Sequence, residues 1–211
     1  MSAPLQTRPA LQDSPPAENE FPAIALTLMQ SRQTVLPKRL AAPGPDEREL
    51  EAILASAGTA PDHGQLLPWR LILVSPSARA PLGEVFGAAL MERDAAATPE
   101  QVTQAREKAH RAPCLLLVTV DGLCGDPQID LMERTVATGC AIQNMLLMAT
   151  ALGYGSALTS GKALKSAHLR TLFGLNDGEH ALCFLSIGTA GASKGHRLRP
   201  QPADYVRILS N

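Results

Sequence analysis

The stretch APDHGQLLPW, residues 60–69, joins an acid, a histidine, a glycine, two prolines and the only tryptophan of the chain. Asp62 and His63 would form an acid–base pair if their side chains met, but adjacent side chains usually diverge, so the signal for a catalytic dyad is weak. The other interpretation is a rigid loop that shapes the wall of a binding site. No G-x-S-x-G nucleophile motif accompanies the pair. Neither the five histidines nor the four cysteines show metal-ligand spacing, so we expect no metal site.

Arginine and small polar residues gather instead where predicted helices and strands end. The four groups are Arg32-Gln33-Thr34, the segment from Thr59 to His63, Thr159-Ser160-Gly161, and Arg199. Guanidinium and hydroxyl groups together suit a phosphate ester, and backbone amides in a T-S-G turn can donate to a planar heterocycle. Taken alone, Arg32 is better explained as a helix C-terminal arginine favoured by the helix dipole. Taken together, and without a glycine-rich dinucleotide or P-loop motif, the groups indicate a phosphorylated planar cofactor.

Four blocks of the sequence resemble, in order, the nitroreductase family of FMN-dependent enzymes and its small YdjA-type subgroup. These blocks are Arg32-Gln33-Thr34, APDHG with the later Pro68-Trp69, Gly139-x₃-Gln143-Asn144, and Thr159-Ser160-Gly161. The resemblance covers roughly residues 24–206, and APDH with PW is its most specific part. Thr34 replaces the serine of the family's R-x-S segment and keeps its hydroxyl. Leu158 and Thr159 replace a Trp-Arg pair of the subgroup, which changes the wall above the flavin.

The resemblance implies an α+β fold, a nitroreductase-like three-layer sandwich with a mostly antiparallel central sheet flanked by helices. It also implies a homodimer that shares two FMN molecules across its interface. The resemblance implies that Arg32, Gln33 and Thr34 bind the FMN phosphate, ribityl chain and flavin edge, and that Arg199 also binds the phosphate. The residues implied to lie against the isoalloxazine are Leu158, Thr159, Ser160 and Gly161. Thr59 and His63 are implied to approach the flavin from the partner subunit. No catalytic residue is implied, because the flavin itself carries the chemistry.

The activity that this resemblance implies is an oxidoreductase with two half-reactions. NADH or NADPH would reduce the flavin, and a small organic acceptor such as a quinone, a nitro compound or an enone would then reoxidise it. An FMN-binding redox sensor or flavin carrier with little turnover shares the same cofactor site and stays open as an alternative. A purely structural dimerisation domain is the third possibility, because the helix predicted over 139–152 is apolar nearly all round.

Composition narrows the partners and the location. A formal net charge of -1, a pI near 6.5 and only 3% aromatic residues give no basis for binding nucleic acid or an anionic membrane. No apolar run reaches the roughly 20 residues of a membrane-spanning helix. Three of the four cysteines lie in apolar runs, which predicts reduced, buried thiols and a cytoplasmic protein. We expect residues 1–20 to form a disordered tail and residues 21–211 a single domain.

Periodicity and turn residues predict the elements that must position these groups. Helices are expected over 21–32, 46–57, 78–91, 99–111, 130–153 and 162–173, and strands over 70–75, 114–120, 154–159 and 181–190. Asp46 with Glu49 is typical of a capping box, and Gly153 is typical of a helix end. Trp69 is expected to begin a buried strand, and the charges of 99–111 to form a solvated helix face. The alternation of helices and strands indicates a three-layer α+β or α/β class.

Overall fold

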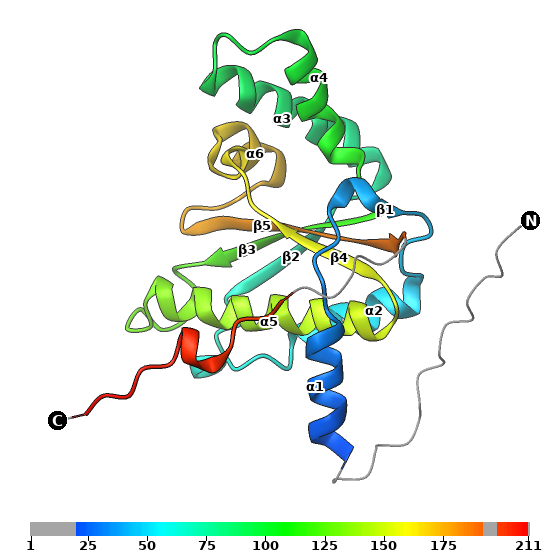
Figure 1. Cartoon of the computed structure of the whole chain (residues 1–211). Coiled ribbons are helices and arrows are strands. Elements are labelled where there is room, and N and C mark those ends of the chain that lie inside the picture. Colours follow the sequence, from blue (N-terminus) through cyan, green and yellow to red (C-terminus); the bar gives the residue numbers. More distant parts are fainter. Residues whose placement is uncertain (1–19, 192–197, 211) are drawn as a thin grey trace, which may run out of the picture.

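The computed structural model describes residues 20–191 and 198–210, so the expected tail lies outside it except for Glu20. A central sheet runs in the order β1 (Leu40–Ala41), β5 (Glu179–Ala190), β3 (Cys114–Asp121) and β2 (Trp69–Leu73) (Figure 1). β4 (Gly155–Thr159) pairs with β5 along the same edge as β1. Every pairing of these strands is antiparallel.

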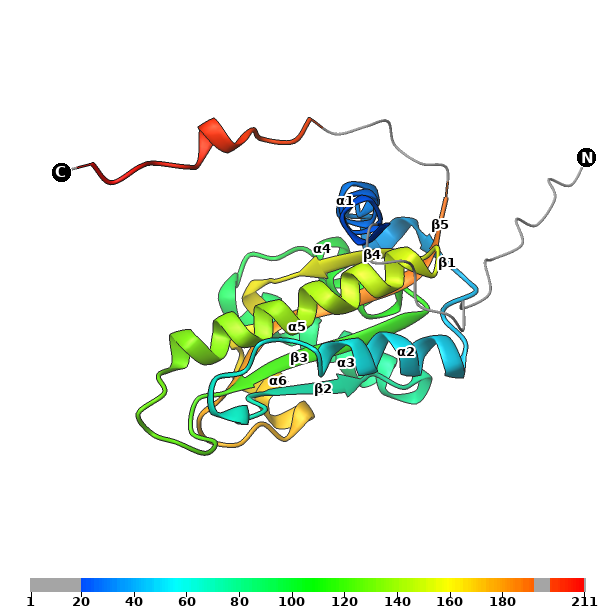
Figure 2. The same ribbon diagram turned by 90° about the horizontal axis from the view of Figure 1, so that it is seen from below.

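Helices cover both faces of the sheet and make three layers. One face carries α2 (Glu47–Ala57) and α5 (Leu131–Ala151), which lie side by side in Figure 2. The other face carries α3 (Arg79–Arg93), α4 (Pro99–Glu107) and α6 (Ala167–Phe173) (Figure 1). Along β3, Leu116 packs into the core on the α5 side, whereas Leu117 packs into the core on the α3 side. The predicted three-layer α+β sandwich with an antiparallel sheet is therefore confirmed, and β3 is apolar throughout because both faces are covered.

Local signals set most helix ends as predicted. Asp46 and Glu49 form a reciprocal capping box at the start of α2, and Gly153 adopts φ +81° just after α5. The helix expected over 162–173 is instead a 3₁₀ turn over Lys162–Lys165 followed by α6. Ser166 breaks it, because its backbone is extended and its hydroxyl accepts the Leu169 amide as an N-cap. Likewise, α4 ends at Glu107 and a 3₁₀ turn over Lys108–His110 follows.

α1 (Phe21–Ser31) projects from the body of the domain and buries none of its residues (Figure 1). Phe21, Ile24, Leu26 and Met29 are all exposed on it, so most of its apolar side chains have no cover within the described chain. The tail segment 198–210 is also exposed and carries further apolar side chains, among them Ile208 and Leu209. Among the helices of residues 20–191 and 198–210, none combines the length and apolarity needed to cross a membrane.

Candidate functional site

The Arg32-Gln33-Thr34 segment leaves α1 and runs alongside the start of β4. Arg32 turns extended (ψ 118°) after α1, and its amide donates to the Leu28 carbonyl at 3.1 Å. The Val35 amide donates to the Ser156 carbonyl at 2.9 Å, and Thr34 forms an isolated parallel bridge with Ser156. Two segments that are far apart in sequence thereby form one short patch of backbone at the sheet edge.

A first cavity of about 480 Å³ opens beside this patch. Gln33, Thr34 and Arg39 line it together with Gly155 of β4. A Cβ at Gly155 would lie only 2.9 Å from side-chain carbons of Ala190 and Leu40, so the wall here has to be bare backbone. The cavity combines a hydroxyl, an amide and a cation, which are the groups that an anionic, hydrogen-bonding ligand requires.

Arg199 ties the tail to the same end of α1. Its Nη2 donates to the Arg32 carbonyl at 2.7 Å and to the Gln30 carbonyl at 3.3 Å. These carbonyls lie at the C-terminus of α1, where a cation is electrostatically favoured. The structure therefore brings Arg199 to the Arg32 segment, as the resemblance implied, but engages the guanidinium with backbone carbonyls.

A second cavity of about 640 Å³ lies toward the other end of β4, and Leu36 lines both cavities. Thr159, Ser160 and Gly161 form one side of it, and Ser186 of β5 lies beside them. A Cβ built on Gly161 would meet nothing within 4 Å, so the backbone of this turn is open to a ligand. Leu158 is not among the lining residues because side chains alternate along β4, and it is exposed at the sheet edge.

α3, α4 and the turn that follows α4 supply the opposite wall. Its cationic lining residues are Arg93, Lys108 and Arg111, and Lys162 adds a fourth cation beside the T-S-G turn. The charges of 99–111 are exposed as predicted, apart from the half-buried Arg111, and Lys108 and Arg111 also line this open cavity. Gln101, Gln104, Lys108 and Arg111 follow one another at helical spacing, and this whole polar stripe faces the cavity. The spacing was visible in the sequence, but which surface the stripe faces was not.

Thr59 and His63 line neither cavity and lie along α5 instead. The Thr59 hydroxyl accepts from Asn144 Nδ2 at 2.9 Å, and His63 Nδ1 is 3.6 Å from Glu133 Oε1. Thr150, on the last turn of the same helix, lines the first cavity. At 1.5 Å per residue, Glu133 and Thr150 are about 25 Å apart along the axis. One chain alone therefore does not bring His63 together with the Arg32 segment.

The APDHG turn that carries His63 is held firmly. The Asp62 carboxylate accepts the Leu67 amide at 2.7 Å, which confirms that this acid serves the turn rather than the histidine. Gly64, Gln65 and Leu67 all have φ between 50° and 70°, and two of them are not glycine. Such left-handed residues are strained and persist only where the surroundings hold them. Trp69, only 9% exposed in the core beneath α5, anchors the end of the segment as predicted.

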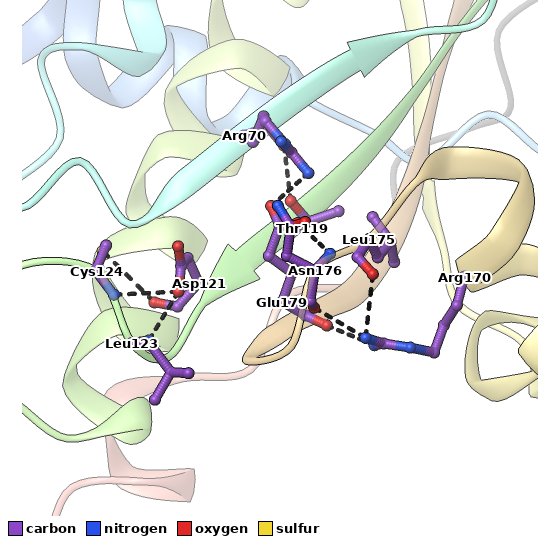
Figure 3. Close-up of polar contacts among 9 residues, drawn as sticks. All are labelled: Arg70, Thr119, Asp121, Leu123, Cys124, Arg170, Leu175, Asn176 and Glu179. Atoms are coloured by element: carbon purple, nitrogen blue, oxygen red, sulfur yellow. Dashed lines mark hydrogen bonds and ion pairs between the residues drawn. The ribbon is translucent and has the colours of Figure 1, made fainter.

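Figure 3 shows a separate polar network at one end of β2, β3 and β5. Arg70 forms an ion pair with the nearly buried Glu179, whose other carboxylate oxygen accepts the Asn176 amide at 2.7 Å. Arg170 donates to the Glu179 and Asn176 carbonyls, each at 2.8 Å. Every member is engaged with backbone or with another member and none lines either cavity, so the network fastens the turn that leads into β5.

Nucleophilic thiol chemistry has little support in the core. Burial raises the pKa of Cys114 to about 11 and the pKa of Cys183 to about 12. Both thiols are therefore protonated and unreactive near neutral pH.

The family model described as "Nitroreductase family" matches residues 30–189. The chain belongs to the nitroreductase family. It is accordingly an oxidoreductase.

Relatives within this nitroreductase family span almost the whole chain. A protein of Haemophilus influenzae, provisionally named NAD(P)H nitroreductase, is 34% identical over 82% of this chain and 91% of its own length. The similarly named YdjA of Escherichia coli is 30% identical over 86% of this chain and 97% of its own. The predicted membership of the family, with its resemblance to the YdjA type, is confirmed.

Solved structures agree on the fold. A nitroreductase-like protein from Bacillus cereus superposes with a TM-score of 0.75 at 20% identity and covers 88% of this chain and 96% of its own. The FMN-dependent nitroreductase NfnB from Mycobacterium smegmatis, solved in complex with NADPH, superposes with a TM-score of 0.71 at 17% identity and covers 90% of this chain and 100% of its own. At these identities, the comparison establishes the nitroreductase fold.

Proposed function

We propose that this nitroreductase-family protein is an FMN-dependent enzyme that passes hydride from NAD(P)H through the flavin to a small organic acceptor. The observation that carries the proposal is the pair of cavities that meet at Leu36 along β4. One is suited to a phosphate and a polyol, and the other offers an open backbone turn and several cations. The names of relatives supply further support: two curated ones include NAD(P)H, and NfnB is described as FMN-dependent.

The donors present fit FMN. Thr34 and Gln33 offer a hydroxyl and an amide in the first cavity, and Arg32 lies next to them in the chain. Guanidinium and hydroxyl groups would bind the phosphate with charge-assisted hydrogen bonds. Gly155 lets the side chains of Leu40 and Ala190 pack directly against the backbone of β4 at the edge of this cavity. Arg39, which sequence reasoning did not single out, adds a cation in the same cavity.

The second cavity would hold the isoalloxazine. Bound FMN supplies the two-electron chemistry there. The Ser160 or Gly161 amide would donate to flavin N5, while Thr159 would border the ring from β4. Lys108 and Lys162 would stabilise the negative charge that reduction places on the pyrimidine end. Quinones, enones and nitro compounds are the acceptor classes that this arrangement serves.

We also propose that the functional unit is a homodimer. The apolar face of α1 and the exposed tail 198–210 require cover, and a second copy would supply it. Pairing two chains would also let Thr59 and His63 reach the site of the partner, since His63 lies about 25 Å along α5 from its own first cavity. The four free cysteines favour a cytoplasmic location for this dimer.

The decisive experiment is an absorption spectrum of the protein as purified, followed by anaerobic titration with NADH and NADPH. We expect a yellow protein that releases FMN on heating and bleaches rapidly with at least one nucleotide. A colourless protein that also fails to take up added FMN would disprove the proposal. A yellow protein that neither nucleotide bleaches would favour the FMN-binding sensor or carrier.

Two variants test the cofactor contacts. Arg32→Ala should weaken FMN binding by about 1.5–3 kcal/mol, the strength of a hydrogen bond to a charged group, which is about 10- to 150-fold in Kd. Arg106→Ala is the matched control, because Arg106 pairs with Glu84 on the surface and lines neither cavity. His63→Ala should change FMN affinity or flavin potential while the fold stays intact. Unfolding of the His63 variant, or unchanged FMN affinity in the Arg32 variant, would reject the assigned roles.

A further inference from the structure

We infer that the second cavity binds the anionic group of a redox partner as well as the flavin. The site would select phosphate-, carboxylate- or sulfonate-bearing substrates over neutral ones. This inference rests on the proposed function, since it names the substrate class of the same site. It is carried by the charges that line the cavity between α3, α4 and the T-S-G turn.

The cavity is strongly cationic. Arg93, Lys108, Arg111 and Lys162 line it, and Asp94 is the one carboxylate among the described residues that do so. The Asp94 carboxylate already accepts the Ala96 amide at 3.1 Å. None of the four cations forms an ion pair or a side-chain hydrogen bond with another residue in 20–191 or 198–210.

Several cations elsewhere in the described chain are held by partners. Arg106, on the same helix as the polar stripe, is held by Glu84, and Arg70 is held by Glu179. Arg79 is buried but satisfied by the carbonyls of Val74, Ala109 and Pro113. Cations that line one cavity without a counter-ion create a positive potential there, which attracts an anionic ligand.

The flavin alone does not account for this excess of charge. Its phosphate would lie in the first cavity, where Arg39 and the Arg32 segment are available. Reduction adds one negative charge to the ring, which a single cation is enough to meet. Several cations in the second cavity therefore remain for another ligand. Arg93 and Arg111 are the two best suited, because a guanidinium fork matches the oxygens of phosphate, carboxylate and sulfonate groups.

The remaining lining residues define the rest of the ligand. Phe86, Leu90, Leu115 and Phe184 form an apolar floor, and Gln101 and Gln104 offer neutral donors and acceptors above it. A planar or aliphatic body with one acidic group would satisfy both parts. This acidic group is one beyond the diphosphate that NADH and NADPH share. It has two chemical sources, the 2′-phosphate of NADPH or an acid group on the electron acceptor.

The test compares, on the FMN-loaded protein, ligand pairs that differ by one anionic group. In each pair the ligand with that additional group is called charged and its counterpart neutral, although NADH itself carries a diphosphate. The variants are Arg93→Gln, Arg111→Gln and the double variant, and Arg106→Gln is the control. NADPH is compared with NADH in anaerobic flavin bleaching, and naphthoquinone-2-sulfonate with 1,4-naphthoquinone in reoxidation of the reduced protein. A second experiment measures binding without turnover. The oxidised protein is titrated with 2′,5′-ADP and with naphthalene-2-sulfonate, and the change in the flavin absorption band reports binding.

We expect the double variant to lose about tenfold or more in affinity for the charged ligand of a pair and less than twofold for the neutral one. Arg106→Gln should change neither. A loss confined to NADPH and 2′,5′-ADP identifies the dinucleotide as the source, and a loss confined to the sulfonates identifies the acceptor. Loss with both means that they share the subsite.

Equal responses to charged and neutral ligands would overturn the inference, as would an unchanged affinity for every charged ligand in the double variant. Weaker FMN binding in that variant, without any change in the charged-to-neutral ratio, would assign the arginines to the cofactor and also overturn it. Failure of the proposed function is seen separately, because the native FMN-loaded protein would then bleach with neither nucleotide. The binding experiment still reads out the cavity in that case.

Discussion

Arg134 carries a buried charge that no carboxylate meets in the described part of the chain, and its replacement should be costly. The residue lies on the first turn of α5 and is 1% exposed. Its guanidinium donates to the carbonyls of Ile129 at 2.8 Å, Asp126 at 2.7 Å and Cys124, and Nη1 also lies 3.0 Å from the Cys124 sulfur. The carbonyls belong to one loop, so a single side chain holds the whole loop against α5.

This loop supports the turn that carries His63. The Cys124 thiol contacts the Leu66 carbonyl at 3.7 Å, and a Cβ added at Gly64 would lie 3.2 Å from Ile129 Cδ1. Removal of the guanidinium would leave several buried carbonyls unpaired and the turn without its support. Arg134 should therefore affect a proposed FMN contact although it lines neither cavity.

The magnitude follows from the number and burial of these bonds. A hydrogen bond to a charged group contributes about 1.5–3 kcal/mol, and water would recover part of the loss at a loop. For Arg134→Met we expect a decrease of about 3–5 kcal/mol in the free energy of unfolding, the scale found when buried charged networks are broken. Arg134→Lys should lose less, because the ammonium keeps the charge and three donors but not the fork.

Urea unfolding followed by circular dichroism measures the effect. Arg106→Met is the control, since an exposed pair such as Arg106–Glu84 contributes no more than about 1 kcal/mol. The variants must unfold with the same m-value as the native protein, because only then does a shift of the urea midpoint report a change in stability. A decrease below about 1 kcal/mol for Arg134→Met would refute the reasoning, because it would mean that the loop carbonyls are satisfied without the guanidinium.

Cys114 and Cys183 should resist a thiol reagent at pH 8 in the folded protein and react fully after unfolding, as mass spectrometry would show; rapid labelling of either in the native state would contradict their burial. Burial raises the Cys183 pKa to about 12, from a value near 9.0 in the unfolded chain. The protonated thiol therefore stabilises the folded state fully below pH 9, and this stabilisation is lost as the pH rises from 9 to 12. The free energy of unfolding should accordingly fall less steeply over this pH range in Cys183→Val than in the native protein. Gly155→Ala should cost about 1–3 kcal/mol by overpacking and lower FMN retention, and a neutral effect in a melting experiment would show that the strand can shift. Asp62→Ala should free the Leu67 amide and strain the turn, lowering stability by about 1–2 kcal/mol, whereas Asp62→Asn should recover part of the loss; wild-type stability of Asp62→Asn would exclude a charge-assisted bond.

The nearly continuous apolar run of β3 showed in advance that a sheet covered on both faces lay at the centre of the chain. Asp46 with Glu49, and Gly153 after α5, marked helix ends that the structure confirms. The order of the blocks around Arg32, His63 and Ser160 indicated the family, which the comparisons then established. Each of these features is local, since a cap, a period or a turn depends on residues a few positions apart.

What required the tertiary structure is how distant groups are brought together. Lys108 and Arg111 are spaced like any solvated stripe, and only the packing of α3 and α4 against the sheet turns them toward a cavity beside Ser160. In the sequence Arg134 looks like an ordinary charged residue of a helix. In the folded chain it is buried, and its guanidinium donates to carbonyls of the loop that precedes α5. Such placements depend on the sum of many long-range contacts, none of which leaves a periodic trace in the chain.

The sequence by itself determined the class of fold, the family and the segments that carry the proposed cofactor contacts, because periodicity, capping and short motifs are properties of neighbouring residues. The tertiary structure alone decided that Arg199 meets the end of α1 and that His63 lies far along α5 from the first cavity of its own chain. It also decided that four unpaired cations converge on one space. The distances between these groups, and the set of charges that line one cavity, are properties of the folded chain. They arise only when segments separated by tens of residues pack together.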